Sequence, residues 1–339
     1  MSASIGQPFE GRYRARCDHY ARLLVLAVLA AVLLGAPSGA GGNRVLAIEI
    51  QDTFDASQMA IDGRRAKELS GLGWDEDEKT LYAVSDKGVL FGFSFKGGEK
   101  SLARLELLSA MRLSDREGSN LPRGLAGAEG LAVRNGDNRI RGDTVLIIAF
   151  ETGSRIASFT TSGRMIEELP VPGAAIEETQ LRGGSRGLEA VAEHRELGLL
   201  TATEQGMLTE PKGRHTIRSS RGRSISVSAI NGGKGRVKAI EVLPDGRILL
   251  LERFKKVGGE QRQSVLRLID TAACDPDQLC GTRDPAPESS QLPPGNFEGL
   301  ARVGTDLFLV VSDDIENGLR ATRSAAPTPA SKPATTCGR

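Results

Sequence analysis

Apolar residues along this chain cluster in short runs that are bounded by Gly, Asp, Asn and Pro. Runs of only four to six residues with flanking turn residues favour buried strands over helices. No long stretch with helical periodicity separates them. The pattern therefore predicts an all-β fold. Clear examples are Leu81–Val84, Val145–Phe150, Leu199–Thr203, Ile248–Leu251 and Leu307–Val311.

The runs belong to a repeating unit, which opens with a short tag, passes through a turn, and ends in an apolar strand that finishes on a carboxylate. Successive tags lie roughly 50 to 60 residues apart, a period typical of propeller blades. We therefore predict a β-propeller with roughly five or six blades of about four antiparallel strands. The tags are Ser70-Gly71-Leu72, Glu129-Gly130-Leu131, Leu188-Glu189-Ala190, Ile240-Glu241-Val242 and Glu298-Gly299-Leu300.

Hairpin geometry is expected to bring the acids of each unit to one end of its blade. In an antiparallel pair the first residue of one strand lies opposite the last residue of its partner. The expected pairs are Glu129 with Glu151, Glu189 with Glu204, Glu241 with Glu252, and Glu298 with Asp313. In the first unit Asp86 ends the strand, but Ser70 stands where the other tags have an acid. If these are the inner strands, up to nine carboxylates gather at one channel mouth: Asp86, Glu129, Glu151, Glu189, Glu204, Glu241, Glu252, Glu298 and Asp313.

A cluster of carboxylates held at low dielectric either takes up protons or binds cations. Oxygen ligands without thiols or imidazoles nearby select calcium or magnesium rather than zinc. We therefore expect the nine acids to be metal ligands, with calcium as the ion and not zinc. The alternative for each acid is that it caps a turn or pairs with a Lys or Arg.

Three basic residues accompany the predicted carboxylate cluster. Lys87 follows Asp86, Arg253 follows Glu252, and Arg186 precedes Glu189 by three residues. Guanidinium groups suit phosphate oxygens, so these side chains are candidates for holding a small anionic substrate such as a phosphoester. The alternative is that they are ordinary salt-bridge partners of the acids.

The N-terminal segment resembles a targeting sequence. A basic region with Arg12, Arg14 and Arg22 precedes the apolar run Leu23–Leu34, and Ser38-Gly39-Ala40 follows as a small-residue cleavage site. An apolar run of this length fits a signal peptide, whereas a membrane-spanning helix needs about 20 residues. An uncleaved membrane anchor is the alternative. We predict a signal peptide over 1–40, a propeller domain over 41–318 and a low-complexity tail over 319–339.

Charge and cysteine content limit the partners of the mature chain. The formal net charge is +1 and charges are mixed along the sequence, without the basic stripe of a nucleic-acid-binding protein. We expect a monomer, periplasmic or secreted, with no stable membrane insertion after signal cleavage. Cys274 and Cys280 bracket a short polar loop, and an oxidising compartment favours a local disulfide between them.

Several motifs, in this order and spacing, resemble the phytase-like family described as having esterase-like activity of phytase. The resemblance runs from about Ser70 to Asp314 and implies a β-propeller exported from bacteria and related to calcium-dependent phosphoesterases of phytate-like substrates. The chain departs from the family pattern at Ser70 and in its polar C-terminal tail. The motifs are Glu129-Gly130-Leu131-Ala132-Val133, Arg186-Gly187-Leu188-Glu189-Ala190, Leu249-Leu250-Leu251-Glu252-Arg253, Phe297-Glu298-Gly299-Leu300-Ala301 and Val310-Val311-Ser312-Asp313-Asp314.

The leading functional hypothesis is a calcium-dependent phosphoester hydrolase with its site at the channel mouth. An unligated carboxylate would act as general base, while Arg253, Arg186 or Lys87 would stabilise developing negative charge. Two alternatives stay open: a non-catalytic exported binding propeller with a structural metal, and a lactonase similar in plan to gluconolactonase. Phosphodiester hydrolysis, lactone turnover, and metal-dependent melting without turnover distinguish the three.

Overall fold

The computed structural model describes residues 26–30, 48–95, 105–173, 180–182, 187–255, 262–274, 280, 282–283, 292–305, 307–312 and 318–323. Over these residues the chain is built from antiparallel strands, and its only α-helical turn is α1 (Ile230–Gly233). The all-β prediction is therefore confirmed. No helix in these ranges is long and apolar enough to cross a bilayer.

Four sheets contain four antiparallel strands each, and each sheet is formed by strands that follow one another in the chain. Consecutive antiparallel strands need only short turns, which the Gly- and Asp-rich segments supply. The first two sheets contain β5 (Leu69–Asp75), β6 (Thr80–Ser85), β7 (Val89–Phe95), β8 (Leu105–Arg112), and β9 (Ala128–Arg134), β10 (Val145–Phe150), β11 (Arg155–Thr160), β12 (Met165–Leu169). The next two contain β13 (Leu188–His194), β14 (Gly198–Thr203), β15 (Arg214–Ser219), β16 (Ile225–Ser228), and β17 (Arg236–Val242), β18 (Ile248–Lys255), β19 (Arg262–Ile269), β20 (Thr282–Arg283).

A further sheet joins strands from the two ends of the described chain. Its order is β1-β2-β23-β22-β21, so the N-terminal strand β2 pairs with β23 near the C-terminus. A separate small hairpin is formed by β3 (Ala60–Ile61) and β4 (Arg64–Arg65). The five strands are β1 (Leu26–Ala30), β2 (Ile48–Thr53), β21 (Phe297–Arg302), β22 (Leu307–Ser312) and β23 (Gly318–Arg323).

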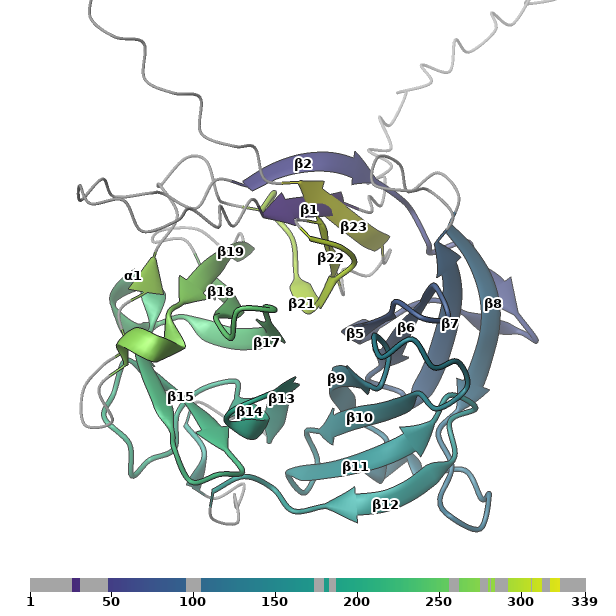
Figure 1. Ribbon diagram of the computed structural model, residues 1–339, viewed down its shortest axis with the longest axis horizontal. Helices are drawn as coiled ribbons and strands as arrows, with labels where there is room; N and C mark the ends of the chain where they lie inside the picture. The colour runs from purple at the N-terminus through teal and green to yellow at the C-terminus, as the bar shows by residue number, and fades with distance from the viewer. Residues whose placement is uncertain are drawn as a thin grey trace, which may run out of the picture.

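The sheets stand around a common centre in a propeller-like ring (Figure 1). Strands β5, β9, β13, β17 and β21 are innermost, and each contacts the inner strand on either side of it. We call these five the inner strands. Their arrangement places equivalent residues of successive repeats next to one another at the centre.

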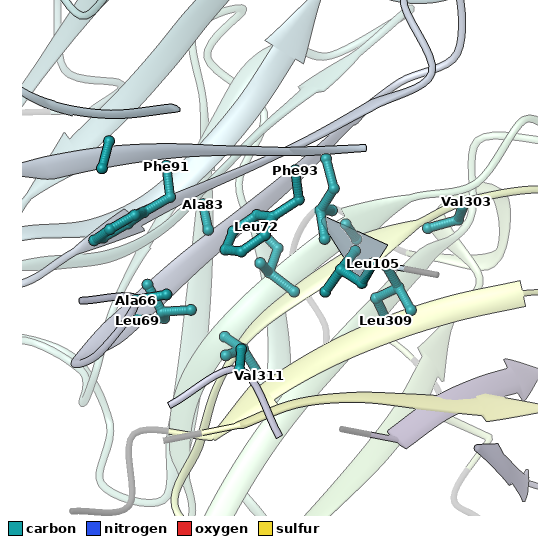
Figure 2. Close-up of a cluster of buried hydrophobic side chains, with 14 of the residues drawn as sticks. Ala66, Leu69, Leu72, Ala83, Phe91, Phe93, Leu105, Val303, Leu309 and Val311 are labelled. Atoms are coloured by element: carbon teal, nitrogen blue, oxygen red, sulfur yellow. The ribbon is translucent and has the colours of Figure 1, made fainter. Parts of the chain in front are cut away.

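The hydrophobic core is divided into five clusters, and each cluster lies between two neighbouring sheets. In the cluster of Figure 2, Leu72, Phe91 and Phe93 from the sheet of β5 pack with Leu309 and Val311 from β22. This contact joins the first tagged repeat to the last, so the buried apolar side chains hold the ring closed.

Strands β1 and β23 lie at the predicted limits of the propeller domain. Strand β1 lies within the predicted signal peptide, where it pairs with β2 and β22, and β23 begins at the end of the predicted propeller domain. Cleavage near residue 40 stays a prediction. The predicted disulfide is confirmed, since Cys274 and Cys280 are bonded, with their Cα atoms 4.5 Å apart.

Candidate functional site

Every inner strand has a β-bulge near its first residue. The pairing with the second strand of the sheet shifts by one residue at the same place in each repeat. A bulge of this kind leaves one residue unpaired and redirects its side chain. The five bulged residues therefore gather at the channel end where the inner strands begin, which we call the bulge mouth. They form the bulge ring: Ser70, Glu129, Glu189, Lys238 and Glu298.

The residue after each bulge is small because neighbouring inner strands approach closely there. A Cβ atom on Gly130 would lie 2.8 Å from the backbone nitrogen of Val191, and one on Gly299 would lie 2.8 Å from the carbonyl oxygen of Ser70. The equivalent positions in β13 and β17 are Ala190 and Ala239. Residues at this level from all five inner strands leave a cavity of only about 10 Å³. We call this level the waist.

Lys238 lies among three carboxylates at the bulge mouth. Its Nζ atom is 3.1 Å from Glu189 Oε2, 3.1 Å from Glu204 Oε1 and 2.7 Å from Glu298 Oε2. The side chain is only 5% exposed. Burial alone would lower the pKa of Lys238, but the neighbouring carboxylates outweigh it and raise that pKa, so the ammonium group stays charged.

Two arginines complete the cluster. The Arg253 guanidinium donates to Glu204 Oε1 at 3.1 Å and to Glu298 Oε1 at 2.5 Å, and it also contacts Asn296. Arg236 donates to Glu204 Oε2 at 2.5 Å. Each carboxylate of Glu204 and Glu298 is therefore held by more than one cation, which fixes its orientation.

The environment drives the pKa values of two neighbouring carboxyl groups in opposite directions. Burial, with added repulsion from Glu204 and Glu298, raises the pKa of Glu189 to about 8, although Lys238 opposes the change. Burial also raises the pKa of Glu204, but Lys238, Arg236 and Arg253 outweigh it, and the net shift is downward. Near neutral pH Glu189 therefore carries a proton and Glu204 is ionised.

Glu129 is the other acid of the ring near these groups. Burial raises its pKa well above the ordinary value, and the charges of Glu189, Glu298 and Glu151 raise it further, while Lys238 lowers it. The bulge mouth thus combines protonated and ionised carboxyl groups with three fixed cations.

The fourth repeat differs from the sequence prediction, which aligned its tag on Glu241. The strand register instead makes Lys238 the equivalent of Glu129, Glu189 and Glu298. Glu241 pairs with Leu249, near the opposite end of β17, so its predicted convergence with Glu252 at one mouth is wrong. The error is one of register, because alignment on the acid shifts this tag three residues along the strand.

Glu252 lies one residue before the position that the other repeats give to an acid. It pairs with Val237, whereas Arg253 occupies the equivalent of Asp86, Glu151 and Glu204. The Glu252 carboxylate is fully buried and bonds His215 Nε2 at 2.8 Å and Arg267 Nη1 at 2.6 Å. It belongs to a buried hydrogen-bond network inside the sheets.

Some of the remaining predicted site residues lie near the bulge mouth, and others are outside the described residues. Glu151 and Asp86 do lie beside the starts of their inner strands, because their backbone nitrogens donate to Gly127 O and Glu68 O respectively. Lys87 is 61% exposed and pairs with Asp86 at 2.6 Å. Asp313 and Arg186 lie outside the described residues.

The donor set at the bulge ring does not fit the predicted calcium ion. The ammonium group of Lys238 already lies where a cation shared by Glu189, Glu204 and Glu298 would be. Across the described ranges, no three His, Cys, Asp or Glu side chains are grouped so that they could hold a metal ion. We therefore derive no chemical step through a metal.

A large cavity lies at the opposite end of the inner strands, which we call the far mouth. It encloses about 1,070 Å³ and is lined by Trp74, Arg134, Glu193, Glu241 and Arg302 among others. Arg134 and Glu193 form an ion pair of 2.6 Å there, and burial raises the pKa of Glu241 to about 7, opposed by Arg302. The size of the cavity favours the far mouth. The bulge mouth, however, contains Glu189 and Glu204, whose pKa values shift in opposite directions, together with three cations. We therefore take the bulge mouth as the candidate site.

Comparison with known proteins identifies the family. A family model described as "Phytase-like: Esterase-like activity of phytase" matches residues 64–314, which is most of the chain and contains the whole bulge ring. The chain belongs to the phytase-like family. The predicted resemblance is confirmed over nearly the predicted range. No curated protein matches the sequence of this phytase-like chain.

Among solved structures, Raptor from Chaetomium thermophilum is similar at 13% sequence identity and a TM-score of 0.39. The match covers 74% of this chain and 19% of that protein, so the phytase-like chain spans about a fifth of its length.

Lys238 is the residue of the candidate site that sequence reasoning missed. The tags were aligned on acids, and this repeat has a lysine at that position. A different signal marks it: each bulged residue precedes a small residue and then an aliphatic one, as in Glu189-Ala190-Val191 and Lys238-Ala239-Ile240. The small residue is required by the close approach at the waist, so it locates the bulge whatever the charge of the bulged residue.

Proposed function

We propose that this phytase-like chain is a hydrolase of ester bonds, with phosphoesters as its first substrate class, and that the reaction takes place at the bulge mouth. The observation that carries the proposal is the pair Glu189 and Glu204. Both contact Lys238 at 3.1 Å, yet one carboxyl group is neutral and the other ionised near pH 7. Carboxyl groups whose surroundings separate their pKa values are suited to act as acid and base.

Each side chain then has a defined role. Glu204 accepts a proton from a water molecule as the water oxygen attacks the phosphorus or carbonyl carbon. Glu189 gives its proton to the leaving-group oxygen as the ester bond breaks. Lys238 and Arg253 stabilise the negative charge that develops on the non-bridging oxygens. The next turnover begins after a proton has moved from Glu204 to Glu189 through solvent.

The first test compares Glu204→Gln with Glu241→Gln in the hydrolysis of p-nitrophenyl phosphate and its diester. Loss of the base is expected to reduce kcat by about 10²- to 10⁴-fold in Glu204→Gln. Glu241→Gln is the matched control, because it removes a half-buried titratable glutamate at the far mouth and is expected to keep activity. Equal losses in both variants, or full activity in Glu204→Gln, would reject the bulge mouth as the site.

The same assay separates the alternatives left open by the sequence. Turnover of a sugar lactone without phosphoester turnover would support a lactonase. Substrate-analogue binding without any turnover would support a binding propeller. Calcium dependence was predicted from the sequence and stays a prediction, which parallel reactions with calcium and with EDTA test.

We further propose a five-bladed propeller, exported to the periplasm or secreted, that acts as a monomer on a small anionic substrate. Five core clusters linking successive sheets support the blade number. The basic, apolar and small-residue order of the N-terminal segment supports export. The cations around Glu204 and Glu298 support the substrate charge.

A further inference from the structure

The hairpin of β17 and β18 reverses the charge pattern of the bulge mouth. At the bulge it contributes Lys238, where three other repeats have glutamate and one has serine. At the end of the second strand it contributes Arg253, where the described repeats have Asp86, Glu151 and Glu204. One repeat therefore supplies cations at both positions that elsewhere supply carboxylates.

The lysine is placed at the centre of this pattern. Three carboxyl oxygens lie within 3.1 Å of Lys238 Nζ, one from each of Glu189, Glu204 and Glu298. The ammonium group donates a hydrogen bond to Glu189 Oε2 and forms ion pairs with the other two. These acids come from two sheets: Glu189 in β13 and Glu204 directly after β14 belong to one, and Glu298 in β21 belongs to another. Lys238, in β17, comes from a third sheet. All three side chains are at most 10% exposed, so solvent screens the repulsion among their charges poorly, and Glu189 relieves part of that repulsion by holding its proton near pH 7.

We infer that the Lys238 ammonium is the permanent counter-ion of the bulge ring and takes the place of a divalent cation among Glu189, Glu204 and Glu298. The folded state then has no need of calcium at this position. Without the lysine, the carboxyl groups of Glu189, Glu204 and Glu298 would form an oxygen-rich ligand set of the kind that calcium prefers, and the ion would release the proton of Glu189 to solvent as it binds. Removal of the lysine side chain should therefore create a calcium-dependent stability that we do not expect this position to give the natural protein.

The experiment measures the melting temperature of the whole chain in EDTA and in calcium. The natural protein and Lys238→Arg, which keeps the charge, are expected to melt at the same temperature in both. Lys238→Ala is expected to melt lower in EDTA and to recover by about 5 °C in saturating calcium, because the ion binds only the folded state. A second change, Glu204→Gln, should abolish that recovery.

Two results would overturn the inference. One is a calcium-dependent rise in the melting temperature of the natural protein that Glu189→Gln removes. The other is Lys238→Ala that responds to calcium no more than the natural protein does.

If Lys238→Ala cannot be purified, calorimetric titration of the natural protein with calcium decides the question. No heat that depends on Glu189 is expected, and a Glu189-dependent site would reject the inference. The measurements concern binding and folding, so they can fail while the proposed hydrolysis stands, and the reverse also holds.

Discussion

At the scale of single residues, the bulge mouth separates two glutamates that have the same intrinsic chemistry. Glu189 has one cation beside it, Lys238, and is buried. Glu204 contacts Lys238, Arg236 and Arg253 together. Burial raises the pKa of both carboxyl groups. The number of neighbouring cations therefore decides which of the two keeps its proton near neutral pH.

This difference predicts the pH profile of ester hydrolysis. The pKa of Glu189 is raised to about 8, so its acidic proton is present below that pH and is lost as the pH rises through 8. The pKa of Glu204 is lowered, so its carboxylate persists to below the ordinary value of about 4.5. We expect kcat/KM to be level across the neutral range and to fall tenfold per pH unit on the alkaline side.

A kcat/KM profile from pH 4 to 10 checks this prediction, with Glu189→Gln measured beside the natural protein. The variant should have lower activity at pH 7 and no alkaline limb of its own near pH 8. An alkaline limb that persists unchanged in Glu189→Gln would assign the titration to another group.

At the scale of elements, the inner strands show which part of the fold is readable in the sequence. Short apolar runs with turn residues between them predicted the strands correctly, because burial of both sheet faces demands such runs. Alignment of the tags succeeded for Glu129, Glu189 and Glu298. It failed at Glu241, because the tags were aligned on acids and not on the small residue that follows each bulge, so the lysine at this position was passed over. Side-chain contacts such as that of Lys238 with Glu204 join different repeats and cannot be read from one repeat.

The small residue after each bulge gives a stability prediction. A Cβ on Gly130 would lie 2.8 Å from Val191 N and 3.1 Å from the backbone of Ala190, and backbone atoms cannot rotate away. Gly130→Ala should therefore lower the free energy of unfolding by about 2 kcal/mol. Gly124→Ala is the control and should be nearly neutral, since nothing lies within 4 Å of its added Cβ. Denaturant melts of both variants measure the difference; equal stability would mean that the strands can separate at little cost.

At the scale of the whole molecule, the ring is closed by pairing between the two ends of the described chain. Strand β2 pairs with β23 through Glu49 with Arg323 and Thr53 with Arg320. Without β1, the order β2-β23-β22-β21 would contain four strands, the same number as the other four sheets. Loss of the predicted signal peptide would therefore leave a sheet like its neighbours.

Two truncations test this closure. A chain that begins at residue 41 should melt at the temperature of the full chain, because β2 still covers the edge of β23. A chain that begins at residue 54 should melt at least about 5 °C lower, since β23 loses its partner strand β2, whose pairing joins the two ends of the chain. N-terminal sequencing of the exported protein should find cleavage near residue 40. Equal melting of the two truncated chains would show that β2 does not close the ring.

The waist determines how molecules enter and leave the proposed site. Residues from all five inner strands surround a cavity of only about 10 Å³ at that level, which is room for about one water molecule. We therefore expect substrate and product to use the bulge mouth alone, so that a product leaves by the route through which the substrate arrived. Product and incoming substrate would then compete for the same opening. A long polymer could present only an end or a side group to the acids, because it could not pass through the ring.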